Sequence, residues 1–266
     1  MIPLVQAKDL TELKHVDNHR PDGGVQRGSK TVRHSTSVKV DIRERPAYPV
    51  TEAANYLRIP ESTLRWWVTG RYYRIKTGVR TVKPVIELPD SDALLLSFMN
   101  LIEAHVLDSI RRKHGVLLPK VRATLEFLRK HYRSKHPLAE EDFQTDGVSL
   151  FVEKYGSLID ASKAGQVAMQ EVLAIYLQRI ERDDTGLPIR LYPFTRKGDP
   201  HDPRVIVIDP RVCFGRPTVA GTNIAAAIVA ERFHAGESVH ELAIDYGRSP
   251  QEIEEAIRCE PRREAA

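Results

Sequence analysis

From Pro49 onward, apolar residues recur at helical spacing. Ala53, Ala54 and Leu57 fall on one face of the segment TEAANYL, and Thr51 is suited to cap the start of a helix. The Arg-Ile-Pro tripeptide that follows interrupts the spacing, because proline lacks the amide proton that a helix interior needs. The pattern predicts a short helix that ends in a sharp break.

A second helix is predicted in the segment ESTLRWWVTG. Leu64, Trp67 and Val68 lie on its inward face, and Gly70 ends it. Such a pair is either a buried helical hairpin or a helix-turn-helix that binds DNA. The second interpretation is favoured because hydroxyl, cationic and aromatic side chains are left on the outer face. These side chains are Ser62, Thr63, Arg65 and Trp66.

The next segment, 71–90, carries β-branched and aromatic residues on both sides of Thr77-Gly78, which predicts a hairpin with a basic tip. Two long amphipathic helices are predicted after it, over 92–115 and 117–132. A basic hairpin directly after a helix pair is typical of a winged helix-turn-helix, in which cations beside the recognition helix bind phosphates.

The second half of the chain alternates strand and helix patterns. Residues 149–162 predict two strands around Tyr155-Gly156, 165–184 predict a helix, and 187–196 predict a further strand. The polar segment KGDPHDPR is the best boundary candidate in this half. A strand, VIVIDP, a glycine-rich turn, FGRPTVAGTN, and three short helices are predicted after it. The chain is therefore expected to be mainly α with small β elements.

Charge is distributed unevenly along the 266 residues, although the formal net charge is only +4. Residues 19–45 carry seven cationic and three acidic side chains, and 101–136 carry nine and three. Residues 222–260 carry three cationic and eight acidic side chains, a net charge of −5. A polyanion therefore suits the first half of the chain and is repelled by its end.

The composition also disfavours several classes of protein. No apolar run approaches the roughly 18 residues of a membrane helix, and the first residues carry acids where a signal peptide is apolar, so a cytoplasmic protein is expected. Cys213 and Cys259 are too far apart in sequence to indicate a disulfide scaffold or a zinc site. The histidines lack cysteine or acidic partners at ligand spacing, and no hydrolase or zinc-protease motif occurs. We expect no enzyme, no cofactor and no metal.

The segment TEAANYLRIPESTLRWW resembles the opening of MerR-family regulators, in which a helix-turn-helix ends in a leucine-arginine-aromatic-aromatic run before a wing. Residues 91–130 are similar to the helices that follow the wing in that family. This chain departs from the family in two places: Arg58 replaces the usual turn glycine, and the hairpin lacks a Gly-Tyr-Arg-x-Tyr run. The resemblance covers about 48–133 and implies a homodimer on a two-fold symmetric operator.

A second resemblance lies in IDPRVCFGRPTVAGTNI together with GESVHELAIDYGRSPQEIEEAI. The glycine turn lacks the ending of a P-loop and the spacing of a dinucleotide fingerprint, so nucleotide binding is not favoured. The two segments resemble a small C-terminal domain of bacterial antitoxins marked by Gly-x-Pro-x-x-x-Gly-Thr-Arg-Ile, although Asn223 stands where arginine is usual. Chains that join both halves in this order resemble VapB-type antitoxins, which are typically encoded beside a PIN-like ribonuclease toxin.

The resemblances imply a DNA-binding antitoxin that neutralises its toxin by direct binding and represses its own operon. Two alternatives stay open: a MerR-like one-component regulator in which 137–200 bind a small effector, and an accessory domain of a nuclease or transferase. The expected parts are a flexible basic arm (1–45), a MerR-like winged helix-turn-helix with supporting helices (46–136), an α/β connecting region (137–200) and a small three-helix C-terminal domain (201–266).

The expected partners are double-stranded operator DNA, the cognate PIN-like ribonuclease toxin and a second copy of the chain, with no membrane. The predicted DNA-binding residues are Ser62, Thr63, Arg65, Trp66, Arg71, Arg74, Lys76 and Arg80. The predicted toxin-binding residues are Arg216, Pro217, Gly221, Thr222 and Asn223.

Overall fold

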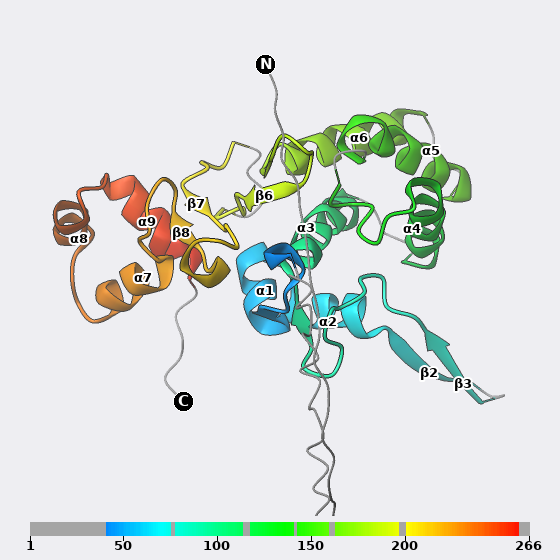
Figure 1. Cartoon of the computed structure of the whole chain (residues 1–266), viewed down its shortest axis with the longest axis horizontal. Coiled ribbons are helices and arrows are strands. Elements are labelled where there is room, and N and C mark those ends of the chain that lie inside the picture. The colour runs from blue at the N-terminus through cyan, green and yellow to red at the C-terminus, as the bar shows by residue number, and fades with distance from the viewer. Residues whose placement is uncertain are drawn as a thin grey trace, which may run out of the picture. The chain divides into compact units, whose positions relative to one another are not determined.

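The computed structural model describes residues 41–75, 78–113, 118–140, 143–159, 163–196 and 201–260. These residues form a mostly helical fold with small antiparallel sheets, as predicted (Figure 1). The α-helices of the described ranges are α1 (Val50–Leu57), α2 (Glu61–Thr69), α3 (Phe98–Lys113), α4 (Leu118–Tyr132), α5 (Val148–Ile159), α6 (Lys163–Leu177), α7 (Ala226–His234), α8 (Val239–Tyr246) and α9 (Pro250–Cys259).

Each described sheet is a pair of short antiparallel strands, and three short helical turns complete the fold. The strand pairs are β1 (Tyr48–Pro49) with β4 (Leu95–Leu96), β2 (Arg71–Ile75) with β3 (Gly78–Val82), β5 (Ile180–Arg182) with β6 (Pro188–Leu191), and β7 (Ile206–Val207) with β8 (Thr218–Val219). The short turns are η1 (Ile42–Glu44), η2 (Phe143–Gly147) and η3 (Cys213–Gly215).

Two hydrophobic cores meet at the segment Ile206–Ile208, which begins with strand β7. Most of the larger core comes from α1 to α6, and the smaller one gathers apolar residues of α7, α8 and α9. Ile206 lies in the smaller core, whereas Ile208, two residues further along the chain, lies in the larger one. The backbone of Ile208 also exchanges two hydrogen bonds with Leu191, of 2.8 and 3.0 Å. This segment therefore links the two cores through both its side chains and its backbone.

The predicted helix pair is present as α1 and α2, with two differences at its ends. Thr51 does not cap α1, which begins at Val50 and has Pro49 in the N-cap position. Arg58 closes α1 in the left-handed conformation, with φ 53° and ψ 37°, where the MerR family usually has glycine. Left-handed backbone costs a non-glycine residue about 1–2 kcal/mol, because its Cβ approaches a carbonyl oxygen. The break between α1 and α2 therefore has the left-handed backbone that glycine usually provides, although arginine stands there.

Gly70 joins α2 to the β2–β3 hairpin and is required in two ways. Its φ is +74°, and a Cβ built on it would lie 2.1 Å from the carbonyl oxygen of Val82. The backbone amides of Val85 and Ile86 then donate to the carbonyl oxygen of Trp67, at 2.7 and 3.0 Å. The hairpin is thus fixed against the C-terminal end of α2 by the close approach of Gly70 to Val82 at the end of β3 and by the segment that follows β3.

The prediction of two strands around Tyr155-Gly156 is wrong, because this segment forms most of α5. Phe151, Val152 and Tyr155 have helical spacing, and all three are buried in the larger core. Gly156 lies inside α5 rather than in a turn, and a Cβ there would lie 2.9 Å from the flexible side chain of Gln166 on α6. A glycine inside a helix is not distinguishable by spacing from one that ends a strand.

Residues 41–45 form the end of the predicted flexible arm, yet they include η1 and are held by side chains far along the chain. Arg43 Nη1 donates to Asp183 Oδ2 at 3.1 Å, and His136 Nε2 lies 3.2 Å from Glu44 Oε2. The rest of the arm, 1–40, lies outside the described residues.

Candidate nucleic-acid and partner interfaces

Helix α2 has one buried face and one polar, exposed face. Leu64, Trp67 and Val68 are 0%, 1% and 5% exposed, as their spacing predicted. On the outer side Ser62 is exposed and Thr63 half-buried, and 42% of the Arg65 side chain is accessible. Leucine and tryptophan thus dock the helix into the core, so that the side chains of its first turn remain free to contact a ligand.

Arg65 is partly engaged on its own helix. Its Nη2 atom lies 2.5 Å from Glu61 Oε1, one helical turn earlier. Exposed pairs of this kind stabilise by only about 0.3–0.5 kcal/mol. A phosphate group can therefore displace Glu61 at little cost.

Trp66 and Arg71 connect α2 to the hairpin. Trp66 is 41% exposed, and the Arg71 guanidinium carbon lies 3.2 Å from the centroid of its ring. This is cation–π stacking, which fixes the guanidinium beside the outer face of α2. The predicted DNA-binding side chains from two elements are thereby brought together.

The sequence prediction missed Tyr72, whose side chain is 74% exposed on β2. Arg74, which is also exposed, follows it by two positions and so lies on the same face of the strand. Strand alternation was the signal that could have found Tyr72. Lys76 lies outside the described residues, and only the backbone of Arg80 is described, paired with Tyr73.

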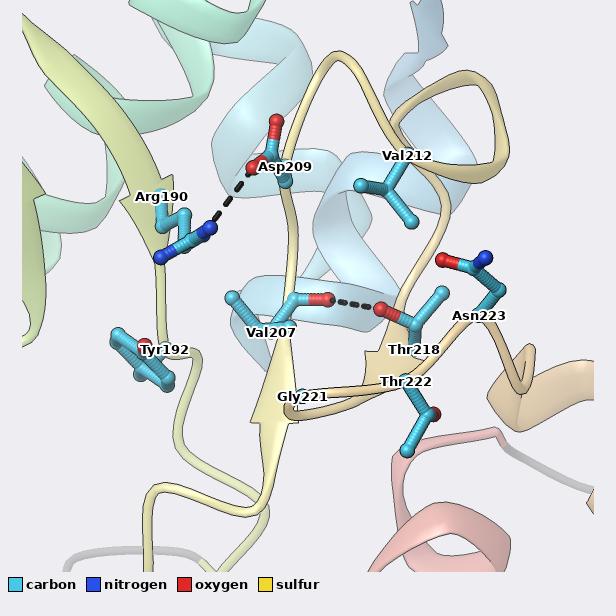
Figure 2. Close-up of a pocket in the computed structure, with 9 residues that line it drawn as sticks. All are labelled: Arg190, Tyr192, Val207, Asp209, Val212, Thr218, Gly221, Thr222 and Asn223. Atoms are coloured by element: carbon cyan, nitrogen blue, oxygen red, sulfur yellow. Dashed lines mark hydrogen bonds and ion pairs between the residues drawn. The ribbon is translucent and has the colours of Figure 1, made fainter.

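The predicted toxin-binding residues divide into two groups. Gly221, Thr222 and Asn223 line a pocket of about 400 Å³, whereas Arg216 is exposed outside it and Pro217 is buried. Figure 2 shows Arg190 of β6 and Tyr192, which follows it, facing the segment that carries Val207 and Asp209, with Val212, Thr218 and Asn223 on the other side of that segment. The pocket therefore joins the glycine-rich turn to a strand that precedes the predicted boundary.

Asp209 is the electrostatic centre of this pocket. It accepts hydrogen bonds from Arg190 Nε at 3.1 Å and from Arg211 Nε and Nη2, both at 3.0 Å. Burial alone would raise the pKa of Asp209, but the hydrogen bonds and charges of these two arginines outweigh it and hold that pKa below its usual value. Asp209 is consequently charged and paired at neutral pH. Sequence spacing gave no sign of its partner Arg190, because the contact depends on the pairing of distant strands.

Most carboxylates of the C-terminal helices form hydrogen bonds or ion pairs within the protein. Ser238 with Glu241 and Ser249 with Glu252 form capping boxes at the starts of α8 and α9. Further carboxylates form ion pairs or are buried, and only a few remain on the surface. The engaged acids are Glu237, Glu241, Asp245, Glu252 and Glu255, whereas Glu231 and Glu254 are exposed. Charge alone therefore does not define a partner surface on these helices.

The residues on either side of α1 contact the glycine-rich turn and the end of α9. A Cβ on Gly215 would lie 2.2 Å from Tyr48 Oη, so the turn fits closely against β1. Arg58 Nη2 donates to the backbone carbonyl of Arg258 at the end of α9. Both contacts fall within the part of the chain from Val40 onward, which forms one compact unit.

The described residues contain no group of three or more His, Cys, Asp or Glu side chains placed to hold a metal ion. Cys213 and Cys259 are free thiols, and burial raises the pKa of the Cys259 thiol to about 12. Among the same residues, none of the helices has the length and hydrophobicity to span a membrane.

Two segments of the chain match protein families. Residues 46–125 match a family described as "Putative DNA-binding HTH domain". Residues 206–258 match a family described as "Protein of unknown function (DUF433)". The first match contains α1, α2 and the β2–β3 hairpin, and the second contains the glycine-rich turn and the last three helices.

Other proteins match this chain over most of its length. It is 32% identical over 232 residues to "Putative antitoxin VapB45" of Mycobacterium tuberculosis (strain ATCC 25618 / H37Rv), across 80% of this chain and 92% of that protein. It is 27% identical over 229 residues to "Uncharacterized protein Rv2308" of the same organism, across 80% and 90%. The crystal structure of Rv2018 from Mycobacterium tuberculosis matches with a TM-score of 0.58 and 25% identity, across 80% of this chain and 98% of that one.

Proposed function

The chain belongs to the same family as the M. tuberculosis protein named "Putative antitoxin VapB45", and from that membership we propose that it is a DNA-binding antitoxin. It binds its own operator through α2 and the β2–β3 hairpin, as a homodimer, and neutralises a PIN-like ribonuclease toxin through the glycine-rich turn. The observation that carries the DNA-binding half is the stack of Arg71 on Trp66, which holds cationic and aromatic groups on the outer face of α2.

The roles of the side chains follow from their positions. Ser62 and Thr63, in the first turn of α2, contact base edges, since short hydroxyl side chains there can reach the major groove. Arg71 and Arg74 neutralise phosphates, and Arg65 joins them when a phosphate replaces Glu61. Such contacts fix the orientation of α2 on the duplex, while the hydroxyls supply discrimination between bases.

Arg74→Ala is expected to weaken binding to the DNA upstream of the operon and to lower the slope of log K against log salt concentration by about 0.9, the value for one phosphate contact. Arg216→Ala is the matched control, because it removes an exposed arginine from the other end of the chain. Fluorescence anisotropy of labelled DNA across a salt series measures the affinity and the slope for each variant. If Arg74→Ala changes neither affinity nor slope, DNA does not bind at this hairpin.

Toxin binding is tested by co-expression with the product of the adjacent open reading frame. Arg216→Glu is expected to lower recovery of the co-purified toxin at least about tenfold, because it reverses an exposed charge in the proposed interface. Binding to operator DNA should not change, which shows that the variant is folded. A regulator that senses a small effector would bind DNA equally well but would not retain the neighbouring gene product.

Point substitution is preferable to truncation in this test. Deletion of the C-terminal part from about Arg204 would remove Ile208 from the larger core. It would also strip buried Thr195 of its partner Glu255 on α9. A truncated chain that failed to bind toxin would therefore report loss of folding as well as loss of an interface.

A further inference from the structure

Phe214 is the most exposed of the large hydrophobic side chains that the structure describes. It is 96% exposed, compared with 74% for Tyr72 and 70% for Ile244. An aromatic ring of this size is normally at least partly covered, because water around apolar surface is unfavourable. A side chain left so fully in solvent needs a reason.

The backbone at this position is strained as well. Cys213, Phe214 and Gly215 have φ angles of 47°, 56° and 77°, so three consecutive residues are left-handed. Glycine adopts this region freely, but the other two residues do so only where the surrounding structure imposes it. Both the exposure and the strain are concentrated on Phe214.

The turn is held in this form by its neighbours. The amide of Gly215 donates to the carbonyl of Val212 at 2.9 Å, and the amide of Arg216 donates to the carbonyl of Cys213 at 3.1 Å. Gly215 is also pressed against Tyr48, whose hydroxyl lies where a Cβ would be. These contacts hold the backbone of the turn, and they leave the Phe214 side chain almost completely in solvent.

We propose that Phe214 is the central anchor of the toxin interface and inserts into an apolar pocket of the toxin that has an acidic rim. This inference rests on the proposed function and names the side chain that dominates its toxin-binding half. A rigid aromatic group loses little conformational freedom on binding, which favours it as an anchor. The acidic rim follows from Arg216, which is exposed two residues away and forms no ion pair with any described residue.

A second copy of this chain fits this surface less well. In a symmetric contact centred on Phe214, each side chain meets the equivalent region of its partner. Arg216 of one copy would then face Arg216 of the other, and like charges at an interface are unfavourable. A different protein, with acidic side chains around an apolar pocket, can bury Phe214 and pair with Arg216 at the same time.

The test measures affinity for the product of the adjacent open reading frame by calorimetry, using the full chain. Phe214→Ala is expected to weaken binding at least about 30-fold, the size of effect found for interface anchors. Phe214→Leu should restore most of the affinity, because it replaces much of the apolar volume. Ile244→Ala is the matched control, as it removes a hydrophobic side chain that is 70% exposed on α8, and should change the affinity less than threefold.

Binding to operator DNA is measured on every variant as a readout of folding, and should not change. The inference is overturned if Phe214→Ala binds the toxin as tightly as the unmodified chain, or if Ile244→Ala weakens binding equally. It is also overturned if Phe214→Ala converts a dimer of the free chain to a monomer in sedimentation, since the anchor would then contact a second copy. If the unmodified chain does not bind the neighbouring product at all, the proposed antitoxin function itself fails.

Discussion

Trp67→Ala is expected to lower the free energy of unfolding by about 3–5 kcal/mol, the usual range for truncating a buried aromatic side chain. Trp67 is 1% exposed and is among the largest fully buried side chains described. Its backbone carbonyl holds Val85 and Ile86, and those hydrogen bonds do not depend on the ring. The loss therefore arises from the cavity beneath α2, and chemical denaturation monitored by circular dichroism measures it.

Trp66→Ala, one position earlier, is the matched control and is expected to behave oppositely. This ring is 41% exposed and stacks with Arg71, so its removal should cost less than about 1 kcal/mol of stability. DNA affinity should fall nevertheless, because the Arg71 guanidinium loses the surface that positions it. Equal destabilisation by the two substitutions would mean that α2 does not present its outer face to solvent, and the proposed recognition surface would be wrong.

This contrast between neighbouring tryptophans was available from the sequence. Leu64, Trp67 and Val68 recur at helical spacing, which assigns Trp66 to the opposite face without any knowledge of the fold. The hairpin was predictable for a similar reason, since β-branched and aromatic residues flank a glycine turn. Local periodicity thus predicted both the helix pair and which face of α2 is turned outward.

Features that depend on contacts between distant segments were not predictable in this way. Gly156 looks like a turn residue in the sequence, yet it lies within α5, whose buried side chains pack in the larger core. Asp209 carries no local sign of its partner Arg190, because the pairing of Leu191 with Ile208 brings them together. Periodicity describes one element at a time, whereas such contacts arise from how elements pack.

Glu255 is the clearest case of a residue whose role sequence patterns conceal. The sequence shows it as one of several acids in an acidic helix, yet it is 0% exposed. It accepts a hydrogen bond from the buried Thr195 hydroxyl, two from the Arg196 guanidinium, at 2.5 and 2.9 Å, and one from Arg258. The carboxylate therefore fastens the segment around Thr195 to α9.

Glu255→Ala is expected to lower the free energy of unfolding by about 3 kcal/mol. Loss of one partner from a buried ionic network typically costs about 3–5 kcal/mol. The low end of this range is expected because the side chains of Arg196 and Arg258 are 40% exposed, so that water can solvate their guanidinium groups once Glu255 is removed. The Thr195 hydroxyl, which is 1% exposed, would lose Glu255 but keep its other carboxylate acceptor, Asp202 Oδ1 at 3.0 Å, which also places the loss at the low end. Glu254→Ala, which removes an exposed carboxylate from the same helix, should change stability by less than about 0.5 kcal/mol.

The pH dependence of stability gives this prediction a second, independent readout. Burial raises the pKa of Glu255, but the hydrogen bonds from Thr195, Arg196 and Arg258 outweigh it, so the pKa in the folded protein lies below the usual 4.5. The charged carboxylate therefore contributes stability above about pH 4.5, and this contribution is lost as the pH falls through the lowered pKa of the folded state. Denaturation curves of the unmodified chain and of Glu255→Gln should accordingly differ most at neutral pH and converge in acid. If the difference in stability between the two proteins is the same at every pH, Glu255 acts through packing alone, and the contact between α9 and Thr195 does not depend on its charge.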